Sequence, residues 1–159
     1  MLKEFSSGMK LLRFVPCDEP VQPIDDPDTP ITWSTVLAKH QGRYVLMYNI
    51  NRQRWENPGG GREQGESCSD AAIREVMEET SQVVSNLRCH GLFKLWLNWT
   101  DRYEYGALYT GTINELQPFV VNNESDRICL WSPGDSLTEP ISELTAFLVS
   151  LLSDGSGNA

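Results

Sequence analysis

The sequence predicts a mixed α+β (α/β) domain in which a β-sheet is flanked by helices. Its 159 residues suit one domain with a core of its own. β-branched and aromatic runs alternate with helical patterns in the order strands, helix, strands, helix. That order is typical of layered α/β and α+β proteins. We therefore expect a single domain over residues 1–153 and a disordered C-terminal tail over residues 154–159.

The first half of the chain reads as strands separated by turns. Residues 9–16 (MKLLRFVP) are a short strand, and the proline- and acid-rich residues 19–30 form a surface loop. Residues 31–40 and 42–50 are β-branched and aromatic runs that meet at Gln41-Gly42, which predicts a hairpin.

A glycine-rich stretch and a helix come next. Ser67, followed three residues later by Asp70, is typical of a capped helix start, and the helix is expected over residues 68–80. A second hairpin, a shorter strand and a last helix complete the chain. Their expected ranges are 87–99 and 103–113 for the hairpin strands, 127–133 for the strand, and 140–152 for the helix.

Composition excludes several classes of protein. The formal net charge of −9 argues against broad binding of DNA or RNA, which needs a basic surface. The sequence has no apolar run of the roughly 18 to 20 residues that a membrane helix needs, and no signal-peptide pattern, so we expect a cytoplasmic protein. The cysteines are far apart and lack CxxC spacing, which favours reduced thiols over disulfides or a zinc site.

Three glutamates crowd the first helix. At about 100° per residue, Glu75, Glu78 and Glu79 fall on one side, and an apolar side is expected to carry Ala72, Ile73, Val76 and Met77. Like charges at i,i+3 and i,i+4 repel each other by a few tenths of a kcal/mol per pair. The cluster is either a solvated helix face or a site for Mg²⁺ or Mn²⁺, which prefer hard oxygen ligands.

The glycines before the helix strengthen the second interpretation. In Asn57-Pro58-Gly59-Gly60-Gly61 the backbone can approach a ligand closely, and a helix N-terminus accommodates anionic groups. A glycine run alone is more often a turn, but here it precedes an acid cluster at a fixed offset.

Together these residues resemble the Nudix box, the signature of a family that hydrolyses nucleoside diphosphates linked to another group. Gly60 is followed after five residues by Glu66, and after seven more by Arg74-Glu75. An aliphatic residue and Glu78-Glu79 complete the charged pattern. The resemblance covers residues 60–82 and implies the Nudix-type fold, a mixed sheet sandwiched between helices.

The resemblance also implies roles for the residues that match. Glu75, Glu78 and Glu79 would bind Mg²⁺ or Mn²⁺, helped by the backbone carbonyl of Gly60. Arg74 would orient the acids and, with Glu66, fix the loop against the helix. The general base that activates water would be Glu75 or an acid of the later loop, Glu124 or Asp126. On the residues alone, a plain polar turn is the favoured interpretation of that loop.

Two positions depart from the family pattern. Ser81 stands where the family has glycine, and Gln82 stands where it has an aliphatic residue. Both follow the acid cluster, so they concern how the helix ends. Ser81 either adopts a left-handed conformation or lets the helix continue.

The residues that recognise the substrate are less clearly marked. Among the tryptophans, Trp55 lies nearest the glycine loop and is the preferred stacking surface for a base. Arg54 and Arg62, with Arg52, bracket the loop and are suited to phosphates. Exposed arginines without a role are the alternative.

The sequence therefore predicts a Mg²⁺-dependent pyrophosphohydrolase acting on a free nucleotide, first of all a nucleoside triphosphate or its oxidised form. ADP-ribose, another sugar nucleotide or a dinucleoside polyphosphate are alternative substrates, and a nucleotide-binding sensor without turnover is an alternative from another class. A 5′-end RNA-processing enzyme is disfavoured by the acidic composition. The resemblance also implies that a homodimer is possible, although no interface is marked in the sequence.

Overall fold

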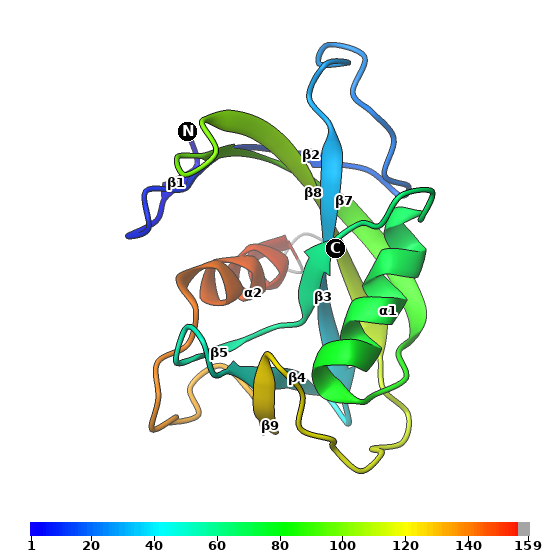
Figure 1. The fold of residues 1–159 in the computed structure, drawn as a ribbon, viewed down its shortest axis with the longest axis vertical. Coiled ribbons are helices and arrows are strands. Elements are labelled where there is room, and N and C mark those ends of the chain that lie inside the picture. Colours follow the sequence, from blue (N-terminus) through cyan, green and yellow to red (C-terminus); the bar gives the residue numbers. More distant parts are fainter. Residues whose placement is uncertain (156–159) are drawn as a thin grey trace.

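The computed structural model describes residues 1–155 and confirms the mixed α+β fold. In the described chain a nine-stranded sheet lies between α1 and α2, which cover opposite sides of β3 (Figure 1). The elements are β1 (Lys3–Glu4), β2 (Lys10–Pro16), β3 (Ile31–His40), β4 (Arg43–Asn49), β5 (Arg54–Glu56), β6 (Gly59–Gly61), α1 (Cys68–Thr80), β7 (Ser85–Leu97), β8 (Arg102–Thr112), β9 (Ser125–Trp131) and α2 (Glu143–Gly155).

Several ends of elements differ from the expectation, and β9 begins and ends two residues earlier than expected. α2 begins three residues after Pro140 and extends to Gly155, into the segment expected to be a tail. The rest of that segment, residues 156–159, lies outside the described residues. The second hairpin turns over residues 98–101, because Leu97 already pairs with Arg102.

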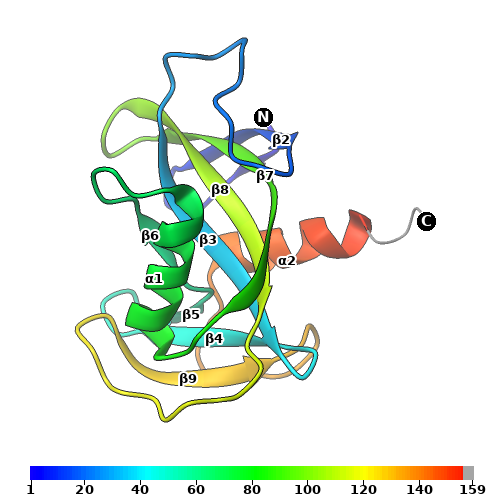
Figure 2. The same ribbon diagram turned by 90° about the vertical axis from the view of Figure 1, so that its right-hand side faces the viewer.

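The predicted hairpin at Gln41-Gly42 is confirmed. His40 pairs with Arg43, and both turn residues have positive φ (49° and 79°), as a two-residue hairpin turn requires. β3 and β4 pair only near this turn. Farther along, β3 lies between β6 and a parallel β8, whereas β4 lies between β5 and β9. Figure 2 shows β4 and β9 running across the direction of β3 and β8. The divergence leaves the glycine strand β6 beside β3 and close to α1.

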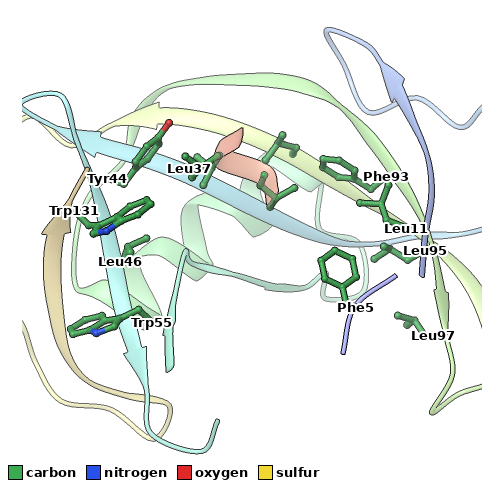
Figure 3. Close-up of a cluster of buried hydrophobic side chains, with 13 residues drawn as sticks. Phe5, Leu11, Leu37, Tyr44, Leu46, Trp55, Phe93, Leu95, Leu97 and Trp131 are labelled. Atoms are coloured by element: carbon green, nitrogen blue, oxygen red, sulfur yellow. The ribbon is translucent and has the colours of Figure 1, made fainter. Parts of the chain in front are cut away.

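The core has two parts because side chains along a strand alternate between faces. In β3, Val36 and Ala38 pack with the α1 side, and Leu37 packs with the α2 side. Figure 3 shows the cluster on the α2 side, where Leu46 lies near the rings of Trp131 and Trp55 and Leu37 lies near Tyr44. Leu148 of α2 is fully buried against this cluster. Both helices are therefore held on the sheet by apolar packing.

The proline-rich loop before β3 has no helix or strand over residues 17–30, as predicted. Asp26 fixes it to the sheet. Its carboxylate accepts the ammonium of Lys94 at 2.6 Å and the hydroxyl of Tyr105 at 2.7 Å, and Thr29 donates to it at 2.6 Å. These contacts, led by Lys94, hold the pKa of Asp26 well below its ordinary value. Within residues 1–155 no helix is long and apolar enough to cross a membrane.

Candidate active site

β6 consists of glycines that lie against both β3 and α1. Gly59 pairs with Thr35 and Gly60 with Ser34. A Cβ atom on Gly60 would lie 2.4 Å from Oε1 of Glu75, and one on Gly59 would lie 2.7 Å from the carbonyl oxygen of Ser34. A side chain at Gly59 would meet the backbone of β3, so only glycine fits there, whereas a side chain at Gly60 would displace the carboxyl group of Glu75. The missing side chains let the carboxylate of α1 reach the backbone of the strand.

The ends of α1 follow local rules. Ser67 has an extended backbone, and its hydroxyl accepts the amide of Asp70 at 3.1 Å, which confirms the predicted N-cap. At the other end Ser81 is left-handed (φ 60°, ψ 20°), and its amide donates to the carbonyl of Met77 at 2.9 Å. Of the two possibilities left open for Ser81, the structure shows the left-handed cap.

The apolar side predicted for α1 is partly wrong. Ile73 and Met77 are 45% and 44% exposed, whereas Glu75 and Glu79 are buried. The buried side follows two rows of residues four apart, because such residues lie above one another on a helix. These rows are Cys68, Ala72, Val76 and Thr80, and Ala71, Glu75 and Glu79. Two of the three glutamates are thus not a solvated face.

Arg74 connects the helix to the glycine loop. Its guanidinium binds both carboxylate oxygens of Glu66, at 2.8 and 2.9 Å, and donates to the carbonyl of Gly61 at 2.9 Å. The same side chain binds Glu75 at 2.8 Å and Glu78 at 3.1 Å. The bond from Arg74 lowers the pKa of Glu66 to about 2. This arrangement matches the predicted role of fixing the loop against the helix.

Glu79 lies in a different environment from Glu66. It is only 5% exposed, and its carboxyl group accepts the amide of Gly59 at 3.1 Å. Burial, together with the nearby carboxyl groups of Glu75 and Glu124, raises its pKa to about 9, against the effect of the Gly59 amide. Among its described contacts Glu79 has no cationic partner. A cation bound beside it would therefore stabilise the charged form of the carboxyl group.

The carboxylates do not yet surround a common point. Within residues 1–155, no three His, Cys, Asp or Glu side chains are grouped closely enough to hold a metal ion. Glu75 and Glu78 are both paired with the guanidinium of Arg74. The donors are nevertheless hard oxygens, they face a glycine strand with room for their approach, and one of them is buried. This chemistry fits Mg²⁺ or Mn²⁺ once the carboxylates turn from Arg74.

The segment before β9 brings another acid to the glutamates. Ser125 donates its hydroxyl to the carbonyl of Glu79 at 2.6 Å, and Asn122 donates its amide to the carbonyl of Glu78 at 3.0 Å. Glu124 lies between these anchors, and its side chain is exposed. Asp126 is instead paired with the neighbouring Arg127 at 2.9 Å. Of the two acids predicted in this segment, Glu124 is the one whose charge acts on Glu79.

A cavity of about 640 Å³ opens beside the glycine strand. It lies between β6, the N-terminal residues, the end of β7 and the start of α2. Its rim is charged, and tryptophan rings contribute to its walls. Besides the glycines of β6, the lining includes Phe5, Met9, Trp33, Arg52, Arg54, Leu95, Trp99 and Glu143.

The prediction that Trp55 provides a stacking surface in the pocket is wrong, because other tryptophans line the cavity. Trp55 is 4% exposed, packs in the core, and donates its indole N–H to Glu139 at 3.2 Å, so it does not line the cavity. Trp33 and Trp99 do. A signal for Trp33 was present in Gly106, because a glycine inside a strand often marks close approach. A Cβ there would lie 2.0 Å from the Trp33 ring.

The arginines predicted for phosphate binding lie in different places. Arg54 lines the cavity, with its guanidinium 2.8 Å from Glu56. Arg62 is exposed beside the glycine strand, and it donates to the sulfur of Cys68 at 3.3 Å rather than lining the cavity.

Comparison with known proteins identifies the class. The model of the NUDIX domain matches residues 28–144, so the chain belongs to the Nudix hydrolase family. A Bacillus subtilis (strain 168) protein described as uncharacterized Nudix hydrolase YvcI is 39% identical over 51 residues, a match that spans 32% of each chain.

Solved structures share the fold. The crystal structure of a mutant of the Bacillus subtilis pyrophosphohydrolase BsRppH superposes with a TM-score of 0.68 at 23% identity, covering 94% of this chain and 92% of that one. A NUDIX hydrolase from Nitrosomonas europaea gives 0.67 at 19% identity, over 80% and 90% of the two chains. A C. elegans Ap4A hydrolase in a binary complex gives 0.58 at 17% identity, over 79% and 98%.

Proposed function

We propose that this protein is a Mg²⁺-dependent (or Mn²⁺-dependent) pyrophosphohydrolase that cleaves a nucleoside diphosphate linked to another group. The observation that carries the proposal is the pair of buried carboxylates, Glu75 and Glu79, which lie against the glycine strand where that strand lines the cavity. A nucleoside triphosphate or its oxidised form is the first substrate to test.

The ion would be held by Glu75, Glu78 and Glu79, with the backbone carbonyl of Gly60. When bound, it would offset the charge of the diphosphate and acidify the attacking water. Arg74 would orient these carboxylates, and it is attached to the loop through Glu66.

Other residues of the site would receive the rest of the substrate. The rings of Trp33 and Trp99 are suited to stacking on a base, and Arg54 and Arg62 are near enough to the glycine strand to meet phosphate oxygens. Glu124 is the acid that we assign to accept the proton of the attacking water, because it lies next to the glutamates while remaining exposed.

A substrate panel tests the proposal. Release of phosphate, pyrophosphate or nucleoside monophosphate is measured with Mg²⁺ for nucleoside triphosphates, oxidised triphosphates, ADP-ribose, sugar nucleotides and dinucleoside polyphosphates. We expect turnover of at least one of these by the wild-type protein and a loss of about 100-fold or more in Glu79→Gln. Equal rates in the variant would contradict the assignment of Glu79.

The same panel separates the alternative functions. Nucleotide binding without turnover of any compound would favour a sensor. Hydrolysis of a triphosphorylated oligonucleotide would favour 5′-end RNA processing, despite the net charge of −9. Sedimentation of the same samples determines whether the protein is a homodimer, which stays a prediction.

A further inference from the structure

The position that departs most from the family pattern is fully buried. Gln82 follows the left-handed cap of α1 and has 0% exposure. An aliphatic residue at this place would need only apolar contact. A buried side-chain amide, in contrast, needs hydrogen-bond partners for its oxygen and its nitrogen.

The partners of Gln82 lie in a segment far along the chain. Its Oε1 accepts the backbone amide of Gln117 at 2.7 Å, and its Nε2 donates to the backbone carbonyl of the same residue at 2.9 Å. Nε2 also donates to the carbonyl of Thr80 at 3.0 Å. The side chain thus binds both backbone groups of one residue, as a neighbouring strand would, and joins them to the last turn of α1.

Neighbouring contacts continue this attachment. The hydroxyl of Ser81 accepts the backbone amide of Val120 at 3.0 Å. Farther on, Asn122 and Ser125 bind the carbonyls of Glu78 and Glu79. The segment therefore lies along the C-terminal end of α1 through contacts that begin at Gln82.

Among the described residues, Gln82 and Ser81 supply the hydrogen bonds of residues 115–121. The two ends of the segment have contacts of their own, because Asn114 donates to Ser85, and Asn122 accepts the amide of Glu124. Residues 113–124 contain no helix or strand, and most of their side chains are exposed. At their end the carbonyl of Glu124 accepts the amide of Ile50 at 2.9 Å. Because exposed irregular chain is mobile unless it is tied down, the position of the Glu124 side chain depends on the attachment to α1.

We propose that Gln82 is a positioning residue: its buried amide holds residues 117–124 so that Glu124 stays beside the last turn of α1, which carries Glu78 and Glu79. This inference rests on the proposed function, in which Glu124 accepts the proton of the attacking water. Ser81 supports the same attachment through Val120. The two departures from the family pattern therefore act together. In place of an apolar contact at the end of α1, the side chains of Ser81 and Gln82 form a polar clamp, the hydrogen bonds that hold Gln117 and Val120.

The test removes the clamp and leaves Glu124 in place. In Gln82→Leu we expect faster hydrogen exchange at the amides of Gln117 and Val120, and a lower kcat with little change in KM. The decisive measurement is a double-mutant cycle. Glu124→Gln should lower kcat roughly 100-fold in the native background, the order of a general base, and less than about tenfold in the Gln82→Leu background.

Matched variants separate positioning from general damage. Gln117→Ala keeps both backbone groups that Gln82 binds, and the side chain that it removes is exposed, so exchange and kcat should stay as in the wild type. Ser81→Gly restores the family residue at a left-handed position and should speed exchange at Val120 while α1 keeps its end. It tests the clamp even if Gln82→Leu does not fold.

The proposal is overturned if hydrogen exchange at the amide of Gln117 is as slow in Gln82→Leu as in the wild type. It is likewise overturned if exchange at the amide of Val120 is as slow in Ser81→Gly as in the wild type. It is also overturned if Glu124→Gln has the same effect on kcat in both backgrounds. If the wild-type protein hydrolyses no nucleotide, the proposed function is wrong, and the exchange data alone then decide whether Gln82 holds the segment.

Discussion

At the scale of single residues, Gly60 allows the side chain of Glu75 in α1 to approach the backbone of β6 closely. A side chain there would occupy the space taken by the carboxyl group of Glu75. Gly61, one residue on, has no such neighbour, because the nearest atom to its Cβ position is a carbonyl oxygen at 3.9 Å. A side chain would therefore disturb the contact between β6 and α1 at Gly60, but it has room at Gly61.

This contrast gives a prediction. In Gly60→Ala the carboxyl group of Glu75 is displaced, so we expect a ~10-fold or larger loss in Mn²⁺ affinity and in kcat, as for other changes that shift metal ligands. Overpacking should also lower the free energy of unfolding by about 1–3 kcal/mol. The matched variant Gly61→Ala should leave ion affinity near the wild-type value, as measured by calorimetric titration with Mn²⁺. Equal effects of the two substitutions would contradict the role of Gly60.

Prediction from the sequence succeeded where residue types have one plausible partner. The resemblance to the Nudix box implied that Arg74 contacts the acids and, with Glu66, the loop, and the structure shows ion pairs of Arg74 with Glu66 and Glu75. Prediction failed where packing decides between equivalent residues. Trp55 is near the glycines in the sequence but lies in the core, whereas Trp33 reaches the glycines and the cavity only because β3 pairs with β6. The partner of Gln82 is 35 residues away, so no local pattern could indicate it.

At the scale of elements, two neighbouring carboxylates fix the proline-rich loop to the sheet: Asp25 pairs with Arg13 of β2 at 2.8 Å, and the less exposed Asp26 binds side chains of β7 and β8. Strand and turn patterns predicted this segment as a loop, but not its attachment to the sheet, because Lys94 and Tyr105 come from distant strands. Asp26 accepts from both, and hydrogen bonds to a charged group contribute about 1.5–3 kcal/mol each. The loop should therefore lose the part of its attachment that Asp26 provides when this side chain is neutralised, while Asp25 keeps its pair with Arg13.

The lowered pKa of Asp26 fixes the sign of the pH dependence. A carboxyl group whose folded-state pKa is lowered stabilises the fold above its ordinary pKa of 3.8, and this contribution is lost as the pH falls below that value. We expect Asp26→Asn to be less stable than the wild type at pH 6, with the difference shrinking below about pH 4. Urea unfolding at several pH values measures it. Asp28→Asn, at an exposed position of the same loop, is the control and should show no such difference.

At the scale of the whole molecule, Asn57 joins the parts that form the site. Its amide group donates to Thr35 at 2.6 Å and to the carbonyl of Val36 at 3.1 Å, and its carbonyl oxygen accepts the hydroxyl of Thr145 at 2.7 Å. The residue before the glycine strand is thereby attached to both β3 and α2. An apolar residue at this position would lack these bonds, which explains the polar residue found in the sequence.

α2 should accordingly contribute to stability as well as to the cavity wall. Leu148 is fully buried, and its replacement by alanine should lower the free energy of unfolding by about 2–5 kcal/mol. Ser150→Ala, on the exposed side of the same helix, should change it by less than about 0.5 kcal/mol. Chemical denaturation compares the two. A loss in Leu148→Ala no larger than in Ser150→Ala would mean that α2 is not packed on the sheet as described.

The central claim is that the buried carboxylates at the glycine strand bind the ion on which hydrolysis depends. Calorimetric titration with Mn²⁺ in the absence of nucleotide tests this claim most directly. The proteins compared are the wild type, Glu79→Gln, and the control Glu19→Gln, which changes an exposed acid distant from Glu79 in the sequence. We predict binding by the wild type and the control, and at least ~10-fold weaker binding by Glu79→Gln. Undiminished binding by Glu79→Gln would contradict the claim.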